Sequence, residues 1–305
     1  MTSVAFLFAG QGAQYDGMLH QLPDHRMIRQ TLEEASQLLG CDVLHLDTAA
    51  TLEKARGAQL CLFVAGVAMA RAVLAEGIQP QAVAGLSVGA FAAGVISGAV
   101  EFVDALHLVD LRAQRMQEVF SSDYGMGVLV GLDERAVQKL VAEIHTAQVP
   151  LYTANVNSPR QIAVAGHAQA LESLFLKARQ QGARRAEKMN VSTLSHCPLL
   201  LPVADELERA AASFTLHPVR IPYISNIGAR HCRQPEAVLR DMVHNIAHGV
   251  RWGDTMTVLD ELQCELFLAM PPGRTLCDLV TENLPAVRSL NMDSCPPGYP
   301  ARLLR

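Results

Sequence analysis

One serine stands between two glycines where chemistry could take place. The segment Gly85-Leu86-Ser87-Val88-Gly89 has the pattern Gly-x-Ser-x-Gly, between an apolar run and a helical pattern. In such a strand-to-helix turn the serine hydroxyl is lifted out of the sheet, and the glycines leave room for the crossing backbones. The N–H groups at the start of the helix then face a developing oxyanion. The pattern predicts a nucleophile at Ser87, although a plain packing turn would use the same residue types.

The same stretch is long enough to be weighed as a membrane helix. Residues 82–100 carry no charge, and Gly85 and Gly89 fit a Gly-x-x-x-Gly spacing. However, most of these residues are alanine and glycine, Glu101 and Asp104 follow at once, and no basic residue flanks the run. We therefore expect a buried strand, a turn and a buried helix, and no membrane association.

A nucleophilic serine needs a base, and the sequence offers eleven histidines. Spacing alone does not choose among them. His107 belongs to an amphipathic helical pattern and is interpreted as structural. His244 and His248 are four residues apart, but the glutamate of the His-Glu-x-x-His zinc motif is absent, so a metal site is disfavoured. His196 lies in a polar loop at a domain boundary, where a cleft would form.

Short apolar runs alternate with helical patterns, which is typical of an α/β fold with a mainly parallel sheet. We expect strands at 4–8, 82–86, 220–227 and 264–273. We expect helices at 58–77, 89–99, 101–120, 196–213 and 241–262. The last segment, 295–305, is expected to be an irregular tail.

The pattern changes in the middle of the chain, where the order of elements becomes β-α-β-β-α-β, as in a ferredoxin-like unit. The expected strands are 126–132, 151–156, 161–166 and 183–189, and the expected helices are 133–145 and 168–182. We therefore predict a large α/β-hydrolase-like domain formed by 1–122 and 191–305. A small ferredoxin-like α+β domain, 123–190, would be inserted into it.

Composition narrows the class of protein. The chain has 305 residues, half of them hydrophobic and 18% charged, so an ordered chain with a large core is expected. The net charge of −5 and the lack of a long basic run disfavour nucleic-acid binding. Seven scattered cysteines without a Cys-x-x-Cys pair indicate reduced thiols in the cytoplasm. The apolar N-terminal run has no basic segment before it and does not fit a signal peptide.

Six segments match the motifs of one enzyme family in the same order, over nearly the whole chain. They are FAGQGAQ, GLSVGAF, LRAQRMQE, ANVNSPRQIAVAG, STLSHCPLL and HNIAHGVRW. These segments resemble FPGQGSQ, GHSxGEY, LRGxxMQ, NSPxQxVIAG, SH-C and xQLxxPVxW of the malonyl-CoA:acyl-carrier-protein transacylases. Six motifs in one order are far more specific than Gly-x-Ser-x-Gly alone.

The resemblance implies a catalytic role for five positions. Ser87 would be the nucleophile, and His196 would be its base and then the acid that protonates the departing thiolate. The backbone N–H groups of Gln11 and Val88 would form the oxyanion hole. A backbone carbonyl at Asn245 would orient the histidine in place of an aspartate. A thioester is already activated, so this set suffices for a ping-pong cycle through an acyl-serine, and no metal or bound cofactor is expected.

The resemblance also implies a substrate contact at Arg112, with the free carboxylate of a malonyl group. A guanidinium matches a carboxylate in bidentate geometry. Without the resemblance, Arg112 would be interpreted as a solvated cation on a helix. The implied partners are malonyl-CoA and an acyl carrier protein with a phosphopantetheine-type arm. Asn157, in the Asn-Ser-Pro turn, is left without a role.

The sequence departs from the family motifs at several positions. Leu86 replaces the histidine before the serine, Ala90 and Phe91 replace Glu-Tyr, Ala9 replaces a proline, and Ala113 replaces a glycine. With these departures the pattern resembles the transacylase (epsilon) subunit of bacterial malonate decarboxylase, which implies other decarboxylase subunits as partners. The alternative is a malonyl transacylase of fatty-acid or polyketide synthesis.

Two functions of other classes remain open. A serine thioesterase or hydrolase would use the same turn at Ser87, but it has no need of a cation that faces the acyl group, so Arg112 argues against it. A non-catalytic carrier-docking subunit would not need Ser87, His196 and Gln11 together.

Five cations gather near the end of the inserted unit, and we name them the basic cluster: Lys177, Arg179, Arg184, Arg185 and Lys188. They are predicted to meet CoA phosphates or an acidic carrier protein. A solvated surface with no ligand is the alternative interpretation.

Overall fold

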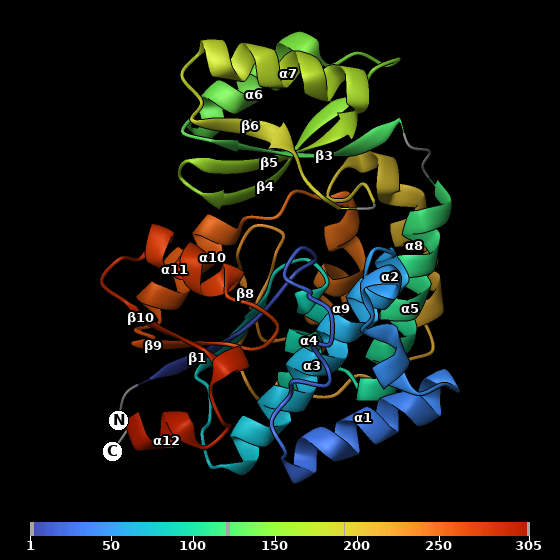
Figure 1. The fold of residues 1–305 in the computed structure, drawn as a ribbon, viewed down its shortest axis with the longest axis vertical. Coiled ribbons are helices and arrows are strands. Elements are labelled where there is room, and N and C mark those ends of the chain that lie inside the picture. Colours follow the sequence, from blue (N-terminus) through green and yellow to red (C-terminus); the bar gives the residue numbers. More distant parts are fainter. Residues whose placement is uncertain (1–2, 120–122, 192, 304–305) are drawn as a thin grey trace.

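Two β-sheets organise the chain in the computed structural model, which describes residues 3–119, 123–191 and 193–303 (Figure 1). The larger sheet consists of β1 (Val4–Phe8), β2 (Ala82–Gly85), β7 (Tyr223–Ile224), β8 (His231–Cys232), β9 (Leu266–Ala269) and β10 (Arg288–Asn291). Its order is β10-β9-β1-β2-β7-β8. Every neighbouring pair is parallel except β7 and β8. The predicted α/β class with a mainly parallel sheet is confirmed.

The central strand β1 explains how distant residues meet. All five of its residues are buried and apolar, which is typical of a strand covered on both faces of a parallel sheet. Leu7 pairs with Ala84 of β2 and with Ala269 of β9. Because the carboxyl ends of parallel strands lie at one edge, the loops after β1 and β2 emerge side by side.

Helices surround this sheet. They are α1 (Arg26–Leu39), α2 (Ala49–Leu52), α3 (Ala55–Ala75), α4 (Gly89–Ile96), α5 (Phe102–Val119), α8 (Leu201–Ala211), α9 (Pro235–His244), α10 (Trp252–Glu261), α11 (Thr275–Asn283) and α12 (Tyr299–Leu303). Short 3₁₀ turns are η1 (Val43–Leu46), η2 (Pro198–Leu200), η3 (Asn245–Ala247) and η4 (Met292–Ser294). Phe120, the last residue of the predicted helix 101–120, lies outside the described residues.

The helix α3 is the one described helix that is long and apolar enough to cross a membrane, and 83% of its apolar window is buried inside the protein. Such burial is typical of a core helix. The stretch weighed as a membrane helix, 82–100, instead forms β2, a turn and the eight-residue α4.

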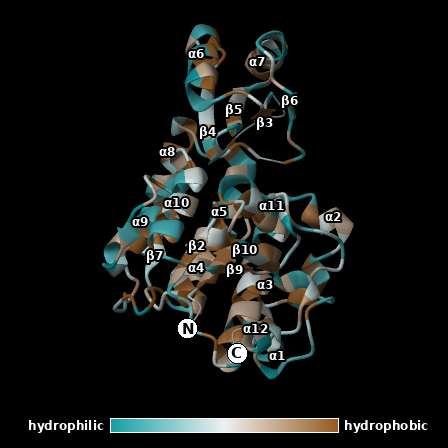
Figure 2. Cartoon of the chain, turned by 90° about the vertical axis from the view of Figure 1, so that its left-hand side faces the viewer, coloured by the Kyte–Doolittle hydropathy of each residue, from teal (hydrophilic) through white to brown (hydrophobic). Residues whose placement is uncertain are grey.

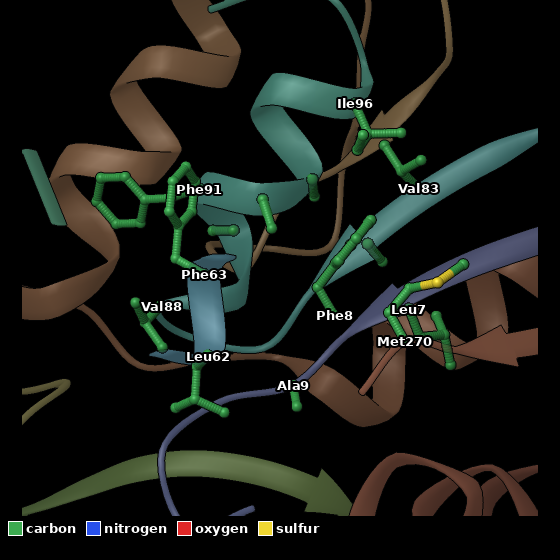
Figure 3. Close-up of a cluster of buried hydrophobic side chains, with 14 of the residues drawn as sticks. Leu7, Phe8, Ala9, Leu62, Phe63, Val83, Val88, Phe91, Ile96 and Met270 are labelled. Atoms are coloured by element: carbon green, nitrogen blue, oxygen red, sulfur yellow. The ribbon is translucent and has the colours of Figure 1, made fainter. Parts of the chain in front are cut away.

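The core beneath α4 is built from aromatic and aliphatic side chains. Phe8 of β1, Phe63 of α3 and Phe91 of α4 belong to one buried cluster (Figure 3). Phe63 also stacks on Phe102 with ring centroids 5.2 Å apart. Hydrophobic segments gather around β2, β9 and α3 in Figure 2, in the interior of the larger unit. This packing gives the turn after β2 a rigid base.

The smaller sheet has its own helices and core. Its elements are β3 (Tyr124–Val130), α6 (Glu134–Ile144), β4 (Leu151–Ser158), β5 (Gln161–His167), α7 (Ala168–Gln180) and β6 (Arg185–Lys188). The strand order is β4-β5-β3-β6 and all pairs are antiparallel, which confirms the ferredoxin-like unit. The helices α6 and α7 cover the side away from the larger unit (Figure 1). The domain boundaries at 122/123 and 190/191 stay predictions, and residues 120–122 lie outside the described residues.

Three sequence predictions were wrong in detail. The predicted helix 241–262 is broken between α9 and α10, because Val250 pairs with β4 through bonds of 2.8 Å to Ala154 and Val156. The predicted strand 220–227 shrinks to Tyr223–Ile224, since the chain turns back at once into β8. The predicted irregular tail contains α12, which begins directly after Gly298.

Candidate active site

Ser87 occupies a strained turn between β2 and α4. Its φ is 57°, in the left-handed region that L-residues with side chains rarely adopt. A Cβ atom added to Gly85 would overlap the carbonyl of Gly89, and one added to Gly89 would overlap the carbonyl of Phe8. The two glycines therefore provide the close backbone approach that the Gly-x-Ser-x-Gly pattern predicts.

His196 lies directly beside this serine. Its Nε2 atom is 2.8 Å from Ser87 Oγ, and its Nδ1 atom is 2.7 Å from the backbone oxygen of Asn245. A carbonyl can only accept, so Nδ1 carries the hydrogen and Nε2 is free to accept the serine proton. The side chain is 2% exposed. Burial, and then the positive charge of Arg112, lower the pKa of His196 to about 4, so the imidazole is neutral at neutral pH.

Arg112 points at the same hydroxyl from α5. Its Nη2 atom donates to Ser87 Oγ at 3.2 Å, and its Nη1 atom donates to Gln59 Oε1 at 2.5 Å. The residue is 1% exposed, its Nε atom has no hydrogen-bond partner, and burial lowers its pKa to about 9. Within the described residues, no carboxylate lies within 4 Å of the guanidinium. The site thus holds a buried cation without a counter-ion.

Gln11 and Val88 flank the serine from two chain segments. Gln11 follows β1 and lines the same cavity as Ser87, while Val88 is the fully buried residue before α4. Among the residues that the structure describes, neither backbone N–H has a protein acceptor. Both groups therefore lack an acceptor within the described part of the protein, as the N–H groups of an oxyanion hole must.

Two further residues hold this arrangement and have no counterpart in the sequence analysis. Gln59 bridges Arg112 to Gln11, with Nε2 donating to Gln11 Oε1 at 3.3 Å. Asn226 Oδ1 accepts from the backbone N–H of Ser87 at 2.9 Å. A polar residue within the apolar run of α3 is a signal that could have revealed Gln59. No comparable signal marks Asn226.

A cavity of about 490 Å³ opens between the two units at this point. From the larger unit it is lined by Ser87, Arg112 and His196, and from β4 by Asn155 and Asn157. The Oδ1 atoms of both asparagines are buried without a hydrogen-bond partner. Asn157, which the sequence left without a role, therefore lines the cavity, and its buried Oδ1 atom has no hydrogen-bond partner among the described residues.

The basic cluster divides into two parts. Arg185 and Lys188 line the cavity, and Arg185 also bonds Glu187 at 2.6 Å. Lys177 pairs with Glu143 at 3.3 Å, away from the cavity. Arg179, a further member, donates to the carbonyl of Ala186 at 2.6 Å. The structure thus brings two of the five cations to the site.

The two histidines that could suggest a metal do not form a site. The ring centroids of His244 and His248 are 6.4 Å apart, and His244 faces Glu208 at 3.4 Å. Over residues 3–119, 123–191 and 193–303, no group of three or more His, Cys, Asp or Glu residues is placed to hold a metal ion.

Comparison with known proteins shows the family to which this chain belongs. Residues 5–295 match the family described as "Acyl transferase domain". The chain belongs to the acyl transferase domain family. This acyl transferase is 34% identical to the malonyl CoA-acyl carrier protein transacylase of Salmonella typhimurium over 286 residues, which are 92% of each chain.

Two solved structures resemble the acyl transferase along its whole length. The malonyl CoA-acyl carrier protein transacylase of Coxiella burnetii has a TM-score of 0.94 at 29% identity, and the match covers 98% of this chain and 96% of that one. The second is a malonyl-transacylase in complex with a type II polyketide acyl-carrier protein. Its TM-score is also 0.94 at 29% identity, and the match covers both chains in full.

Of the departures from the family motifs, Ala9 and Leu86 line the cavity of the acyl transferase. Leu86 lines the cavity and packs closely against Gly10, where an added Cβ would lie 2.8 Å from the Leu86 oxygen. Ala90 and Ala113 are fully buried. These residues leave the contact between Ser87 and His196 intact.

Proposed function

We propose that this protein transfers a malonyl group from malonyl-CoA to the phosphopantetheine-type thiol of an acyl carrier protein, through a malonyl-serine at Ser87. The observation that carries the proposal is Arg112, a buried cation that touches the nucleophile and has no carboxylate partner among the residues that the structure describes. Malonyl-CoA supplies the missing carboxylate.

The first half-reaction forms the acyl-enzyme. Ser87 Oγ attacks the thioester carbonyl while His196 Nε2 accepts its proton. The N–H groups of Gln11 and Val88 stabilise the oxyanion. When the intermediate collapses, the bond between carbon and sulfur breaks and the imidazolium returns its proton to the CoA thiolate. The carbonyl of Asn245 holds the ring in the required tautomer throughout.

The second half-reaction repeats these steps with the carrier thiol as nucleophile. His196 takes the thiol proton, and the sulfur attacks the ester carbon of the malonyl-serine. The bond between Ser87 Oγ and the acyl carbon then breaks, and His196 returns the proton to the serine. The only substrates that the cycle needs are malonyl-CoA and the carrier thiol, in keeping with a ping-pong mechanism.

Selection for malonyl follows from the position of the guanidinium. In a malonyl-serine the carbon of the free carboxylate is the second carbon beyond the ester carbonyl carbon. Arg112 can reach this carboxylate, because its Nη2 atom lies 3.2 Å from Ser87 Oγ. A carboxylate at this position gives the buried guanidinium of Arg112 an ion-pair partner. An acetyl group would leave the cation unpaired.

The relatives favour fatty-acid or polyketide synthesis as the pathway. Those reported above are malonyl CoA-acyl carrier protein transacylases and a polyketide malonyl-transacylase, and none of them is a malonate decarboxylase subunit. We therefore replace the decarboxylase assignment by its alternative, with malonyl-CoA and an acyl carrier protein as partners. Seven free cysteines fit a reducing, cytoplasmic setting.

Intact-mass spectrometry tests the proposal. The protein is mixed with malonyl-CoA, and its mass is recorded before and after addition of a holo acyl carrier protein, with Ser87→Ala as the control. We expect a malonyl adduct that persists in buffer and moves to the carrier. An adduct that hydrolyses before the carrier is added would identify a thioesterase. The absence of an adduct would identify a docking subunit, and either result would overturn the proposal.

A further inference from the structure

The strained turn at Ser87 is held by one side chain from the loop after another strand. Asn226 lies after β7, and its amide bridges the two sides of the turn. Its Oδ1 atom accepts from Ser87 N–H at 2.9 Å, and its Nδ2 atom donates to the Gly85 carbonyl at 2.9 Å. The flipped amide would set donor against donor and acceptor against acceptor, so its orientation is fixed by these partners.

A buried carboxylate fixes Asn226 in turn. Asp241 of α9 is 3% exposed. Its Oδ2 atom accepts from Asn226 N at 2.9 Å, Asn226 Nδ2 at 3.1 Å and the Tyr223 hydroxyl at 2.6 Å, and its Oδ1 atom accepts from Ile227 N at 2.9 Å. This carboxylate therefore sets the position of the asparagine through both its backbone and its amide.

The same helix end also orients the base. Asp241 and Asn245 are four residues apart, and Asn245 N–H donates to the carbonyl of Asp241 where α9 ends. The Asn245 carbonyl accepts from His196 Nδ1. One turn of backbone thus connects the support of the nucleophile to the support of its base.

We propose that Asn226 and Asp241 are positioning residues, which hold Ser87 in its left-handed turn at hydrogen-bond distance from His196. The left-handed conformation of Ser87 costs free energy. The Asn226 amide offsets this cost, because it forms hydrogen bonds with the Ser87 N–H and the Gly85 carbonyl. The proposal rests on Ser87 as nucleophile, and therefore on the proposed function, but it does not depend on which acyl group Ser87 carries.

A fluorophosphonate probe tests the pair without any acyl substrate, because Ser87 Oγ displaces fluoride from phosphorus. In Asn226→Ala and Asp241→Asn we expect the labelling rate of Ser87 to fall by about 10- to 100-fold, since misplacement near 1 Å can cost 100-fold. The turnover rate for malonyl transfer should fall equally, while the KM for malonyl-CoA changes by less than about threefold.

The matched control is Asp47→Asn. Asp47 is also a buried carboxylate that accepts from two backbone N–H groups, those of Leu19 and His20, but it lies away from the turn. We expect it to lower the melting temperature without changing the labelling rate. If Asn226→Ala and Asp241→Asn lose stability in the same way and label at the wild-type rate, the pair is only structural and the proposal is overturned.

A second variant keeps the test decisive if Asn226→Ala does not fold. Asn226→Asp sets a carboxyl group against Asp241, and the two share a proton only when the pH is low. We expect the labelling rate of Asn226→Asp, divided by that of the wild type at the same pH, to be low near pH 8. This ratio should rise by at least about threefold near pH 5.5. A ratio that does not change with pH would contradict the proposal. Labelling that follows the proposal without a malonyl adduct would refute only the proposed function.

Discussion

Arg112 is the residue whose surroundings are most specific to a substrate. A guanidinium removed from water without a carboxylate partner costs free energy, and burial accordingly lowers its pKa to about 9. Gln59 supplies only a neutral acceptor. A site that tolerates such a cation gains most from a ligand that carries an anion to it, and the proposed preference for a malonyl over an acetyl group rests on this argument.

The low pKa of His196 predicts how acylation depends on pH. The imidazole must be neutral to accept the serine proton, so the rate falls only as the pH falls toward the pKa of about 4. We expect a flat acylation rate between about pH 8 and 6, whereas an ordinary histidine would already be half protonated near pH 6.5. Rapid-quench mass spectrometry of the Ser87 adduct measures the profile. A midpoint near 6.5 in the wild type would contradict the assigned environment.

The candidate site residues that stand in recognisable motifs could be predicted from the sequence, whereas the residues that hold them in place could not. Ser87, His196 and Arg112 stand in segments whose pattern indicates their chemistry, and the structure places both His196 and Arg112 in contact with Ser87. Gln59 contacts Arg112, which is 53 residues away, and Asn226 contacts Ser87, which is 139 residues away. Nothing in their local sequence shows these partners.

At the scale of elements, the turn between β2 and α4 depends on two glycines for space. Gly85→Ala forces a Cβ atom into the Gly89 carbonyl. We expect unfolding free energy to fall by about 3 kcal/mol, as for severe overpacking, and Ser87 labelling to fall with it. Urea titration measures the stability loss.

Gly125→Ala is the matched control for that substitution. Its Cβ would lie 3.3 Å from the flexible end of Lys188 and in ordinary van der Waals contact with Leu171, so a small change is expected. Equal losses in the two variants would show that the close approach at Gly85 is not what shapes the turn.

Element prediction succeeded where the pattern was local and failed where another segment decided the conformation. The cap at Asp133, which accepts from Ala136 N–H at 2.9 Å, begins α6 as predicted. The break after α9 follows from pairing of Val250 with β4, a contact made across nearly a hundred residues. Periodicity carries no information about such pairing.

At the scale of the whole molecule, the cavity joins the two units. The loops after β1 and β2 contribute Gln11 and Ser87, α5 contributes Arg112, and the loop before η2 contributes His196. The strands β3, β4, β5 and β6 form the opposite wall. The sequence predicted a cleft at the domain boundary, because His196 follows the inserted unit. It could not show that Arg185 and Lys188, but not Lys177, reach that cleft, since this depends on which face of the small sheet meets the larger unit.

The cavity-lining cations predict an electrostatic contribution to substrate binding. With Arg185→Glu and Lys188→Glu together, we expect the KM for malonyl-CoA to rise by about tenfold at low salt, and by less at high salt because of screening. Lys177→Glu, outside the cavity, is the control and should change little. Steady-state kinetics at two ionic strengths measures both. Equal effects of the two charge reversals would assign the basic cluster to a solvated surface.

The partition between malonyl and acetyl groups measures whether Arg112 selects the acyl group. Wild type and Arg112→Ala are each mixed with malonyl-CoA and acetyl-CoA, and the rate of each Ser87 adduct is followed by intact mass. We predict that Arg112→Ala loses the malonyl rate by about 100-fold or more and the acetyl rate by less than about tenfold, because the lost pairing concerns only the free carboxylate. Equal losses for the two acyl groups would contradict the account.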